Sequence, residues 1–476
     1  MGKRWFVLLL ALVLVFITAC SNGNNGNNGN GGGSNSANNG GNEGGSTPAP
    51  SGNDQEKPEE DTVVVWTYPV HGYYEDELKE LVADIEQQYP HITVKTEMLS
   101  WAEGPQKFDV ALNSGNPPDL YFHSVDGMYV NTGLAIQLDE YLTPEIKEDY
   151  YPGTLELGQI QGKQYGLPLY QYQWAWGGNK RILEEAGIDW QTIQKEGWTW
   201  TEFKEAAQQL TKQLPDGSTQ YALVTDGTSL DFIEMLTRNN NMPDVLDEEG
   251  NFQWNDERIV ETLTFIKDLL DAGHMPKETA AIAPAKRTEM FYAGQAAIIS
   301  KAIPYYDVMI VNRNKDIDAG KVEGEKIDFV LLPVPHHDGA PPKTTMGGEG
   351  YVAFRQKNDK GEEHARNTFL VMEALSGAKA GNSANELALP FVRKSQAELF
   401  EGKGLGNPVN QEAAKIMAEN ISMPVVLKLD VDLAAKQKQF KEQVVKPNIQ
   451  ALFAGEKSPE DIAEEFKSRG QQILGP

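Results

Sequence analysis

Hydrophobic residues near the start of the folded part of the chain repeat with two different periods. TVVVWTY (62–68) is apolar throughout, as in a strand buried on both faces, and HITVKTEML (91–99) alternates like a second strand. Between them, 74–89 carries apolar residues at helical spacing. A further helical stretch, 103–115, leads to the short strand PPDLYFH (117–123). This strand–helix–strand order predicts an α/β fold that begins with a parallel sheet.

The rest of the chain also predicts helices alternating with strands. Thr199 and Glu202 form a capping-box pattern at the start of a helix over 197–214. Asn255 is the expected cap of a second helix, which extends toward Pro276. Strand-bearing segments are expected at 291–300, 326–335 and 347–354, and a mostly helical C-terminal third ends in a helix that begins near Ser458.

One segment, LYQYQWAWGGN (169–179), has an aromatic residue at every second position. These residues are Tyr170, Tyr172, Trp174 and Trp176. In an extended strand they share one face, because side chains two residues apart point the same way. The pattern fits either a surface that binds a ligand or a row of core side chains.

The N-terminal region has the features of an exported lipoprotein. Residues 1–19 have a basic start, an apolar run over 6–17 that is shorter than the roughly 20 residues of a membrane span, and small residues before Cys20. The sequence ITAC resembles a lipobox, so Cys20 is the expected lipidation site. The Asn-, Gly- and Ser-rich residues that follow, to 61, predict a disordered tether.

Composition excludes several classes of function. The formal net charge is −27, which argues against nucleic acid as the main partner. A single cysteine permits neither an internal disulfide nor a cysteine-based zinc site. The chain lacks a nucleophile elbow, a His-Glu-x-x-His motif and a phosphate-binding loop. No cofactor or metal site is predicted, and with 69 acidic residues a pair of carboxylates alone does not indicate a glycosidase.

Eight segments together resemble the sugar-type (family 1) extracellular solute-binding proteins of ABC importers. They are NSGNPPDLYF (113–122), QYGLP (164–168), NKRILEEAGID (179–189) with GWTWTEFKEAA (197–207), MFYAGQAAII (290–299), LLPVP (331–335), GGEGYVAF (347–354) and GEKSPEDIAEEF (455–466). Their shared order along the chain makes the resemblance specific. One departure is Gly178, which stands where the family usually has an aromatic residue before Asn-Lys.

The resemblance implies a two-lobed fold of the periplasmic-binding-protein type. Each lobe is expected to be a mainly parallel sheet flanked by helices, with the ligand cleft between the lobes. The implied first lobe comprises 62–168 and 303–372, and the implied second lobe comprises 169–302 and 373–476. In this arrangement Tyr170 and Tyr172 face the cleft near the first crossover, while Trp176 belongs to the core.

The resemblance also implies which residues line the cleft. Aromatic rings suit the apolar faces of a sugar, and carboxylates, amides and histidines suit its hydroxyls. The expected ligand-binding residues are Tyr68, His71, Trp101, His123, Asp126, Tyr170, Tyr172, Trp174, Asp231, Phe232, Tyr305, Gly348 and Glu349.

The expected function is therefore that of a monomeric, membrane-anchored binding lipoprotein on the extracytoplasmic face of a bacterial membrane. It would capture a carbohydrate, with an oligosaccharide favoured, and pass it unchanged to the permease subunits of an ABC transporter. Two alternatives remain at this point. The same protein could serve a membrane sensor, or it could be a secreted carbohydrate-active hydrolase, which would convert its ligand to products.

Overall fold

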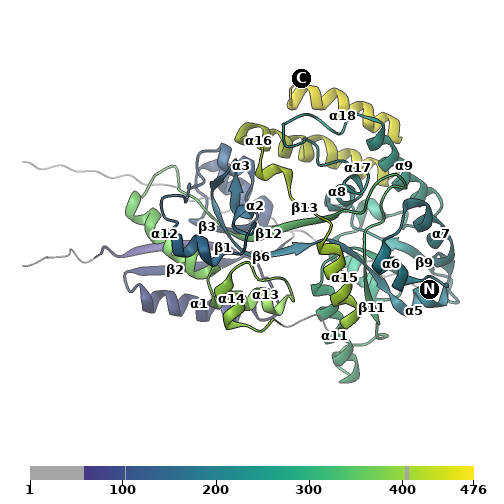
Figure 1. Ribbon diagram of the computed structural model, residues 1–476, viewed down its shortest axis with the longest axis horizontal. Helices are drawn as coiled ribbons and strands as arrows, with labels where there is room; N and C mark the ends of the chain where they lie inside the picture. The colour runs from purple at the N-terminus through teal and green to yellow at the C-terminus, as the bar shows by residue number, and fades with distance from the viewer. Residues whose placement is uncertain (1–57, 102, 403–406, 476) are drawn as a thin grey trace, which may run out of the picture. The chain divides into compact units, whose positions relative to one another are not determined.

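The computed structural model describes residues 58–101, 103–402 and 407–475 (Figure 1). The expected signal peptide, Cys20 and the tether as far as residue 57 lie outside the described residues. Within the described ranges, no helix combines the length and apolar character that a membrane span needs.

The first sheet has six strands and opens as the sequence predicts. Its strands are β1 (Asp61–Thr67), β2 (Ile92–Met98), β3 (Leu120–His123), β6 (Gly166–Gln173), β12 (Thr344–Ala353) and β13 (Ile421–Ser422). Their order is β13-β12-β3-β1-β2, with β6 also paired to β12. β1 is parallel to both β2 and β3, whereas β12 is antiparallel to β3 and β6.

Both faces of the first sheet are covered. Tyr121 and Phe122 are adjacent in β3, so they point to opposite faces, and both are fully buried. The covering elements are α1 (Tyr74–Gln88), α2 (Gly104–Ser114), α3 (Gly127–Asn131), α4 (Pro144–Asp149), η1 (Leu155–Gly158), the hairpin of β4 (Gln159–Ile160) and β5 (Lys163–Gln164), α12 (Glu362–Ser376), η3 (Lys379–Gly381), α13 (Asn382–Glu386) and α14 (Lys394–Leu399). We call this sheet and its covering elements the first lobe.

The second sheet has five strands and its own core. Its strands are β7 (Ala175–Asn179), β8 (Lys212–Gln213), β9 (Thr219–Val224), β10 (Ala296–Ala302) and β11 (Phe329–Leu332), in the order β11-β7-β10-β9-β8. Only β9 and β10 run parallel. The expected α/β fold with two sheets is present, but both sheets are mixed in direction. β12 is antiparallel to β3 and β6 in the first sheet, and β7 is antiparallel to β10 and β11 in the second.

Helices of the second lobe surround this sheet. They are α5 (Lys180–Glu185), α6 (Trp190–Glu196), α7 (Trp200–Leu210), α8 (Asp231–Arg238), α9 (Glu257–Asp271), η2 (Thr279–Ala281), α10 (Pro284–Tyr292), α11 (Tyr305–Asp318), α15 (Pro408–Ala418), η4 (Val425–Leu427), α16 (Val431–Phe440), the π-helical η5 (Lys441–Val445), α17 (Lys446–Phe453) and α18 (Pro459–Ile473). The capping box of Thr199 and Glu202 is confirmed. The cap of α9 is Asp256 and not Asn255, because the Asp256 carboxylate accepts from the N–H of Arg258 at 2.9 Å.

The chain crosses between the sheets at Trp174. β6 pairs with β12 through Gln173, the N–H of Trp174 donates to Thr345 at 2.8 Å, and β7 then joins the second sheet between β10 and β11. In Figure 1, β6 extends from the strands of the first sheet toward those of the second. The crossing therefore lies later than the expected boundary at Pro168, because β12 offers pairing partners along the whole of β6.

Two other lobe boundaries also differ from the expected ones. The segment from 303 to 343 contains β11, which pairs with β7, so it lies with the second sheet and not the first. α13 and α14 lie with the first lobe, where Leu387 and Leu389 enter its core and Gln396 donates to the carbonyl of Ser376 at 3.3 Å. These assignments follow from strand pairing and packing at long range, which local sequence patterns do not encode.

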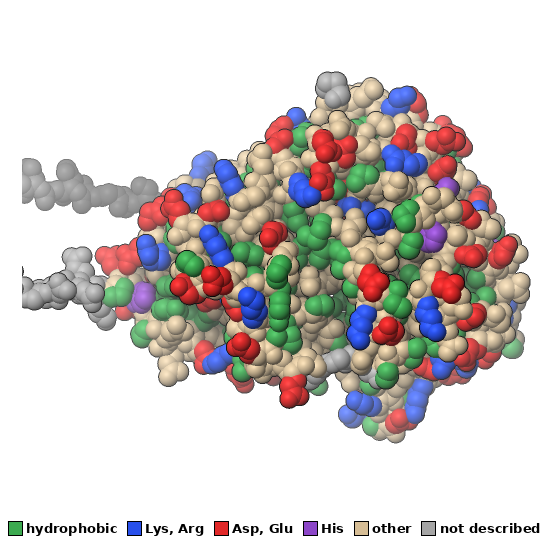
Figure 2. Space-filling model, in the orientation of Figure 1, with side chains coloured by type: hydrophobic (Ala, Val, Ile, Leu, Met, Phe, Trp, Pro, Cys, Tyr) green, Lys and Arg blue, Asp and Glu red, His purple; other side chains and the backbone are tan. Residues whose placement is uncertain are grey.

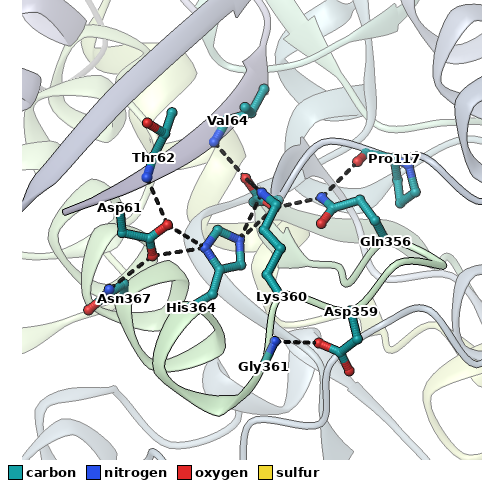
Figure 3. A network of polar contacts seen from close by, with 11 residues as sticks. Asp61, Thr62, Val64, Pro117, Gln356, Asp359, Lys360, Gly361, His364 and Asn367 are labelled. Carbon is teal, nitrogen blue, oxygen red and sulfur yellow. Dashed lines mark hydrogen bonds and ion pairs between the residues drawn. The ribbon is translucent and has the colours of Figure 1, made fainter. Parts of the chain in front are cut away.

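A polar network fixes the beginning of β1 (Figure 3). His364 of α12 places Nδ1 2.8 Å from Asp61 Oδ2 and Nε2 2.9 Å from Asp119 Oδ1. Asp119 is fully buried and also accepts from the N–H of Val64 at 2.8 Å. Lys360 completes the group with an ion pair to Asp119 at 3.1 Å. The network joins β1, the start of β3 and α12 within the first lobe.

Candidate functional site

The ends of β1 and β2 carry a stacked pair of aromatic rings. Tyr68 follows β1, Trp101 follows β2, and their ring centroids lie 4.2 Å apart with the planes at 14°. Tyr68 is fully buried, whereas Trp101 is 45 % exposed and donates its indole N–H to the carbonyl of Pro69 at 3.3 Å. The first ring thus supports the second, and the indole keeps accessible surface at the carboxyl end of the strands.

Close packing holds Tyr68 in place. Its hydroxyl lies 2.6 Å from that of Tyr121 in β3, and burial raises the pKa of Tyr68 to about 12. Gly104 lies against the ring, where an added Cβ would come within 2.5 Å of it. A side chain at position 104 would therefore displace the tyrosine that supports Trp101.

Glu349 lies on β12 of the first sheet, opposite Tyr170 of β6. The Tyr170 hydroxyl donates to Glu349 Oε2 at 2.5 Å. Burial raises the pKa of Glu349 to about 6, the hydrogen bond from Tyr170 acts in the opposite direction, and the negative charge of Asp231 raises it further. Asp231 is the first residue of α8, so a carboxylate from the second lobe is near the carboxylate from the first.

The four alternating aromatic residues have different surroundings along the crossing strand. Tyr170 is buried, Tyr172 and Trp174 are half-buried, and Trp176 is fully buried. Tyr172 and Trp174 meet edge to face at 5.3 Å. Trp176 packs against Phe203 at 5.1 Å in the second core, in agreement with the predicted core role. The middle two rings are therefore the ones that keep accessible surface.

A second polar group lies beyond the end of β3. Asp126 caps α3 by accepting from the N–H of Met128 at 2.8 Å, and its other oxygen pairs with Lys438 of α16 at 2.8 Å. Burial and the charge of Lys438 lower the pKa of His123 to about 4, so this histidine is neutral at ordinary pH. The ion pair between Asp126 and Lys438 connects α3 of the first lobe to α16 of the second.

Several other expected site residues have mainly structural contacts. His71 is buried, with Nε2 2.7 Å from Glu77 in α1. Phe232 is 1 % exposed in the second core, stacked on Trp176 at 6.0 Å, so its ring has almost no surface to offer a ligand. Gly348 contributes its backbone, since its carbonyl accepts from the Ser124 hydroxyl at 2.8 Å.

Tyr305 is the first residue of α11 and is not among the residues that line a separate cavity of about 530 Å³ beside α1. The cavity is lined by Tyr73, Asp76, Glu77, Glu80, Leu81, Asp84, Lys379, Asn382, Glu386 and Phe400. Burial, together with the ionisable groups of Glu386 and Tyr73, raises the pKa of Tyr305. Tyr73 is the most exposed aromatic residue there, at 73 %.

Lys301 and Lys438 contact expected site residues, and local sequence patterns do not predict either lysine. The Lys301 ammonium pairs with Asp231 and lies 5.4 Å from the centroid of the Trp174 ring. The available signal was one charged residue within the apolar segment 296–303. For Lys438, which lies on an ordinary polar helix, the sequence offered no comparable signal.

The arrangement combines apolar rings with carboxylates and suits a ligand that has both apolar faces and hydroxyl groups. Figure 2 shows apolar side chains gathered near the middle of the visible face, where Figure 1 places β6 and β12. Among the residues that the structure describes, no group of three or more His, Cys, Asp or Glu side chains is arranged to hold a metal ion.

Comparison with known proteins gives one family match and many structural matches. Residues 71–381 match the family model described as "Bacterial extracellular solute-binding protein". An arabinooligosaccharide-binding protein from Halalkalibacterium halodurans is 25 % identical over 332 residues, which is 68 % of each chain.

Two solved structures illustrate the similarity of fold. An ABC substrate-binding protein from Listeria monocytogenes, in complex with cycloalternan, aligns with a TM-score of 0.67 at 16 % identity and covers 88 % of this chain and 100 % of its own. The maltose/maltodextrin-binding domain MalE from Bdellovibrio bacteriovorus, bound to maltotriose, aligns with a TM-score of 0.66 at 20 % identity and covers 87 % and 100 %.

Proposed function

Because the chain belongs to the family of bacterial extracellular solute-binding proteins, we propose that it captures a neutral oligosaccharide and delivers it to the permease of an ABC importer. The family consists of solute-binding proteins, which agrees with the expected absence of catalysis. The observation that carries the choice of ligand is the exposed face of Trp101, stacked on Tyr68, at the strand ends of the first lobe.

The two sides of the proposed site would make different contacts with a sugar ring. Trp101 offers an apolar surface on the first lobe, and Tyr172 and Trp174 offer a second one where the chain crosses. Glu349 and Asp231 supply acceptors for hydroxyl groups. The names of two similar proteins support a saccharide, since one is an arabinooligosaccharide-binding protein and the other is bound to maltotriose.

We further propose that Cys20 is lipidated and anchors the protein on the extracytoplasmic face of the membrane. The support is the sequence ITAC after an apolar run, followed by a long Asn- and Gly-rich segment. An anchored protein of this kind would hold its ligand close to the permease.

A thermal-shift screen tests the proposed function. The chain from residue 21 is heated with maltotriose, mannotriose, arabinotriose and chitotriose, and with glucose and arabinose as monosaccharides. A sugar at 100 times its Kd should stabilise the folded state by about 2.7 kcal/mol. Chromatography of the recovered sugar then distinguishes a binder, which returns it intact, from a hydrolase.

Trp101→Ala is the matched site variant, and Tyr151→Ala is its control. Tyr151 is another partly exposed aromatic residue, at 38 %, and its backbone N–H bonds to Val392, which is not a proposed site residue. The first variant should lose the sugar-dependent shift and the second should keep it. If none of the six sugars stabilises the wild-type chain, the carbohydrate proposal is wrong.

A further inference from the structure

Lys301 has an unusual backbone conformation for its residue type. Its φ is 55°, in the left-handed region that residues with a side chain rarely adopt. The register of β10 against β7 shifts between Ile299 and Ala302, so Lys301 occupies a β-bulge. Bulges redirect side chains, and strained backbone is retained where the surrounding structure fixes it.

The bulge directs the lysine side chain into a cluster of acceptors. The ammonium pairs with Asp231, donates to Ser229 Oγ at 2.9 Å and lies 3.7 Å from Asp226 Oδ2. The side chain is only 11 % exposed, and a cation so little solvated requires such compensation. Asp226 is fully buried and already pairs with Arg287 at 3.1 Å. The closest ionic contact of Lys301 is therefore Asp231.

The same ammonium also contacts an aromatic residue of the proposed site. It lies 5.4 Å from the centroid of the Trp174 ring, within the range of a cation–π interaction. Trp174 in turn meets Tyr172 edge to face. Asp231 is 33 % exposed and is close enough to raise the pKa of Glu349. One lysine thus contacts both the ring at the crossing between the sheets and a carboxylate whose charge acts on Glu349 of the first lobe.

We propose that Lys301 is a positioning residue of the sugar site, which fixes the Asp231 carboxylate and the Trp174 ring in the orientation that the oligosaccharide requires. This inference rests on the proposed function. Without the ammonium, Asp231 would lose its closest cation while the negative charge of Glu349 remains nearby, so its carboxylate would turn toward solvent. Trp174 would at the same time lose the cation on its face. Both effects weaken the half of the site that the second lobe provides.

The test measures affinity for a named set of sugars by calorimetric titration of the chain from residue 21. Wild type is titrated with maltotriose, mannotriose, arabinotriose and chitotriose, and the sugar that it binds most tightly is used with every variant. Lys301→Met should bind at least 10-fold more weakly, whereas Lys301→Arg, which keeps the charge, should stay within about 3-fold of wild type.

A double variant distinguishes positioning from a general structural effect. Asp231→Asn alone should weaken binding at least 10-fold, but in the Lys301→Met background it should weaken it less than 3-fold, because Asp231 is already misplaced there. Lys180→Met is the matched control. Lys180 also pairs with an aspartate, Asp328 at 3.1 Å, and lies 5.5 Å from the centroid of a tryptophan ring, that of Trp190. The affinity of Lys180→Met for the sugar should equal that of wild type.

Each outcome has a defined meaning. If wild type binds none of the four sugars, the proposed function fails and this inference fails with it. If wild type binds and Lys301→Met binds equally well, or if the effects of Lys301→Met and Asp231→Asn multiply as for independent residues, only the positioning role is overturned. Should Lys301→Met not fold, Lys301→Gly replaces it, because glycine accepts the positive φ while still removing the ammonium.

Discussion

Replacing His364 with glutamine should destabilise the protein in a pH-dependent way. Nδ1 of this ring lies 2.8 Å from Asp61 and Nε2 lies 2.9 Å from Asp119 (Figure 3). Both nitrogens can donate hydrogen bonds only when the ring is protonated, because a neutral imidazole has one donor and one acceptor. Nε2 also lies 3.1 Å from Lys360 Nζ, but a carboxylate at each ring nitrogen favours an imidazolium between them.

The magnitude follows from the burial of the group. Asp119 is fully buried and the His364 side chain is 8 % exposed, so removing the histidine leaves a buried carboxylate with fewer partners. Breaking such a pair costs about 3–5 kcal/mol. Asp119 keeps Lys360 at 3.1 Å and Gln356 at 2.6 Å, which places the expected loss for His364→Gln near the lower end, at about 3 kcal/mol.

The sign of the pH dependence follows from the pKa shifts. Burial would lower the pKa of His364, but Asp119 and Asp61 raise it by more, so the net pKa is raised. The folded protein then holds a proton that the unfolded chain has released. This contribution is complete below the unfolded histidine pKa of about 6.5 and disappears as the pH rises through the folded value.

The two carboxylates set the acidic limit of the same effect. Burial would raise the pKa of both carboxylates, but hydrogen bonds lower it by more. Asp61 accepts from Asn367 and His364, and Asp119 accepts from His364 and Gln356. Their contributions are present above the unfolded aspartate pKa of about 3.9 and are lost as the pH falls further. The difference between wild type and variant should thus be largest between about pH 4 and 6.5.

Urea denaturation of wild type and His364→Gln at pH 5, 7 and 9 measures the difference in the free energy of unfolding. The control is His274→Gln, because burial lowers the pKa of His274 and the pH dependence then has the opposite sign. The free energy of unfolding of wild type should increase relative to that of His274→Gln as the pH rises. A difference for His364→Gln that is constant or increases from pH 5 to 9 would refute the doubly paired imidazolium.

Three further predictions concern the site and the anchor. Tyr172→Ala should weaken oligosaccharide binding by about 1–3 kcal/mol with little change in Tm, whereas Trp176→Ala should cost about 3–5 kcal/mol of stability and change affinity less. Calorimetric titration measures the affinities and melting curves measure the stabilities. The reverse pattern would show that the ring assignments are wrong. The pKa of Glu349 is raised to about 6, and only its ionised form accepts hydrogen bonds from sugar hydroxyls at both oxygens. Sugar affinity should therefore fall about tenfold as the pH drops from 7 to 5. Calorimetric titrations of Glu349→Gln at the two pH values should show no such dependence. Cys20→Ser should release the protein from membranes or leave its signal peptide uncleaved, which cell fractionation and the size of the chain measure. Membrane retention of a correctly cleaved variant would contradict lipidation.

Periodicity and capping patterns predict the first strands and helices of the chain and several later elements. The early strand–helix–strand series and the helix cap at Thr199 depend on residues within a few positions of each other, so local sequence specifies them. The ends of the predicted strands also indicate which residues come together. Tyr68 and Trp101 meet because the parallel strands β1 and β2 end at one edge of the sheet.

The errors arose where long-range contacts decide the outcome. Nothing near β11 in the sequence shows that it pairs with β7, and so the segment from 303 to 343 was expected in the wrong lobe. Phe232 and Lys301 show the same limitation within the site. The ring turns into the core to pack on Trp176, and the lysine reaches Asp231 only because a bulge redirects it.

The alternating aromatic residues show why spacing alone does not assign a role. Spacing predicts a shared face, but the strand that carries these rings passes from one sheet to the other at Trp174, so its neighbours change along its length. Tyr170 therefore meets Glu349 in the first lobe and Trp176 enters the core of the second. Tyr172 packs against the first core and Trp174 against the second, but neither ring is buried within its core, so both retain accessible surface at the passage between the sheets. The role of each ring depends on its distance from the crossing.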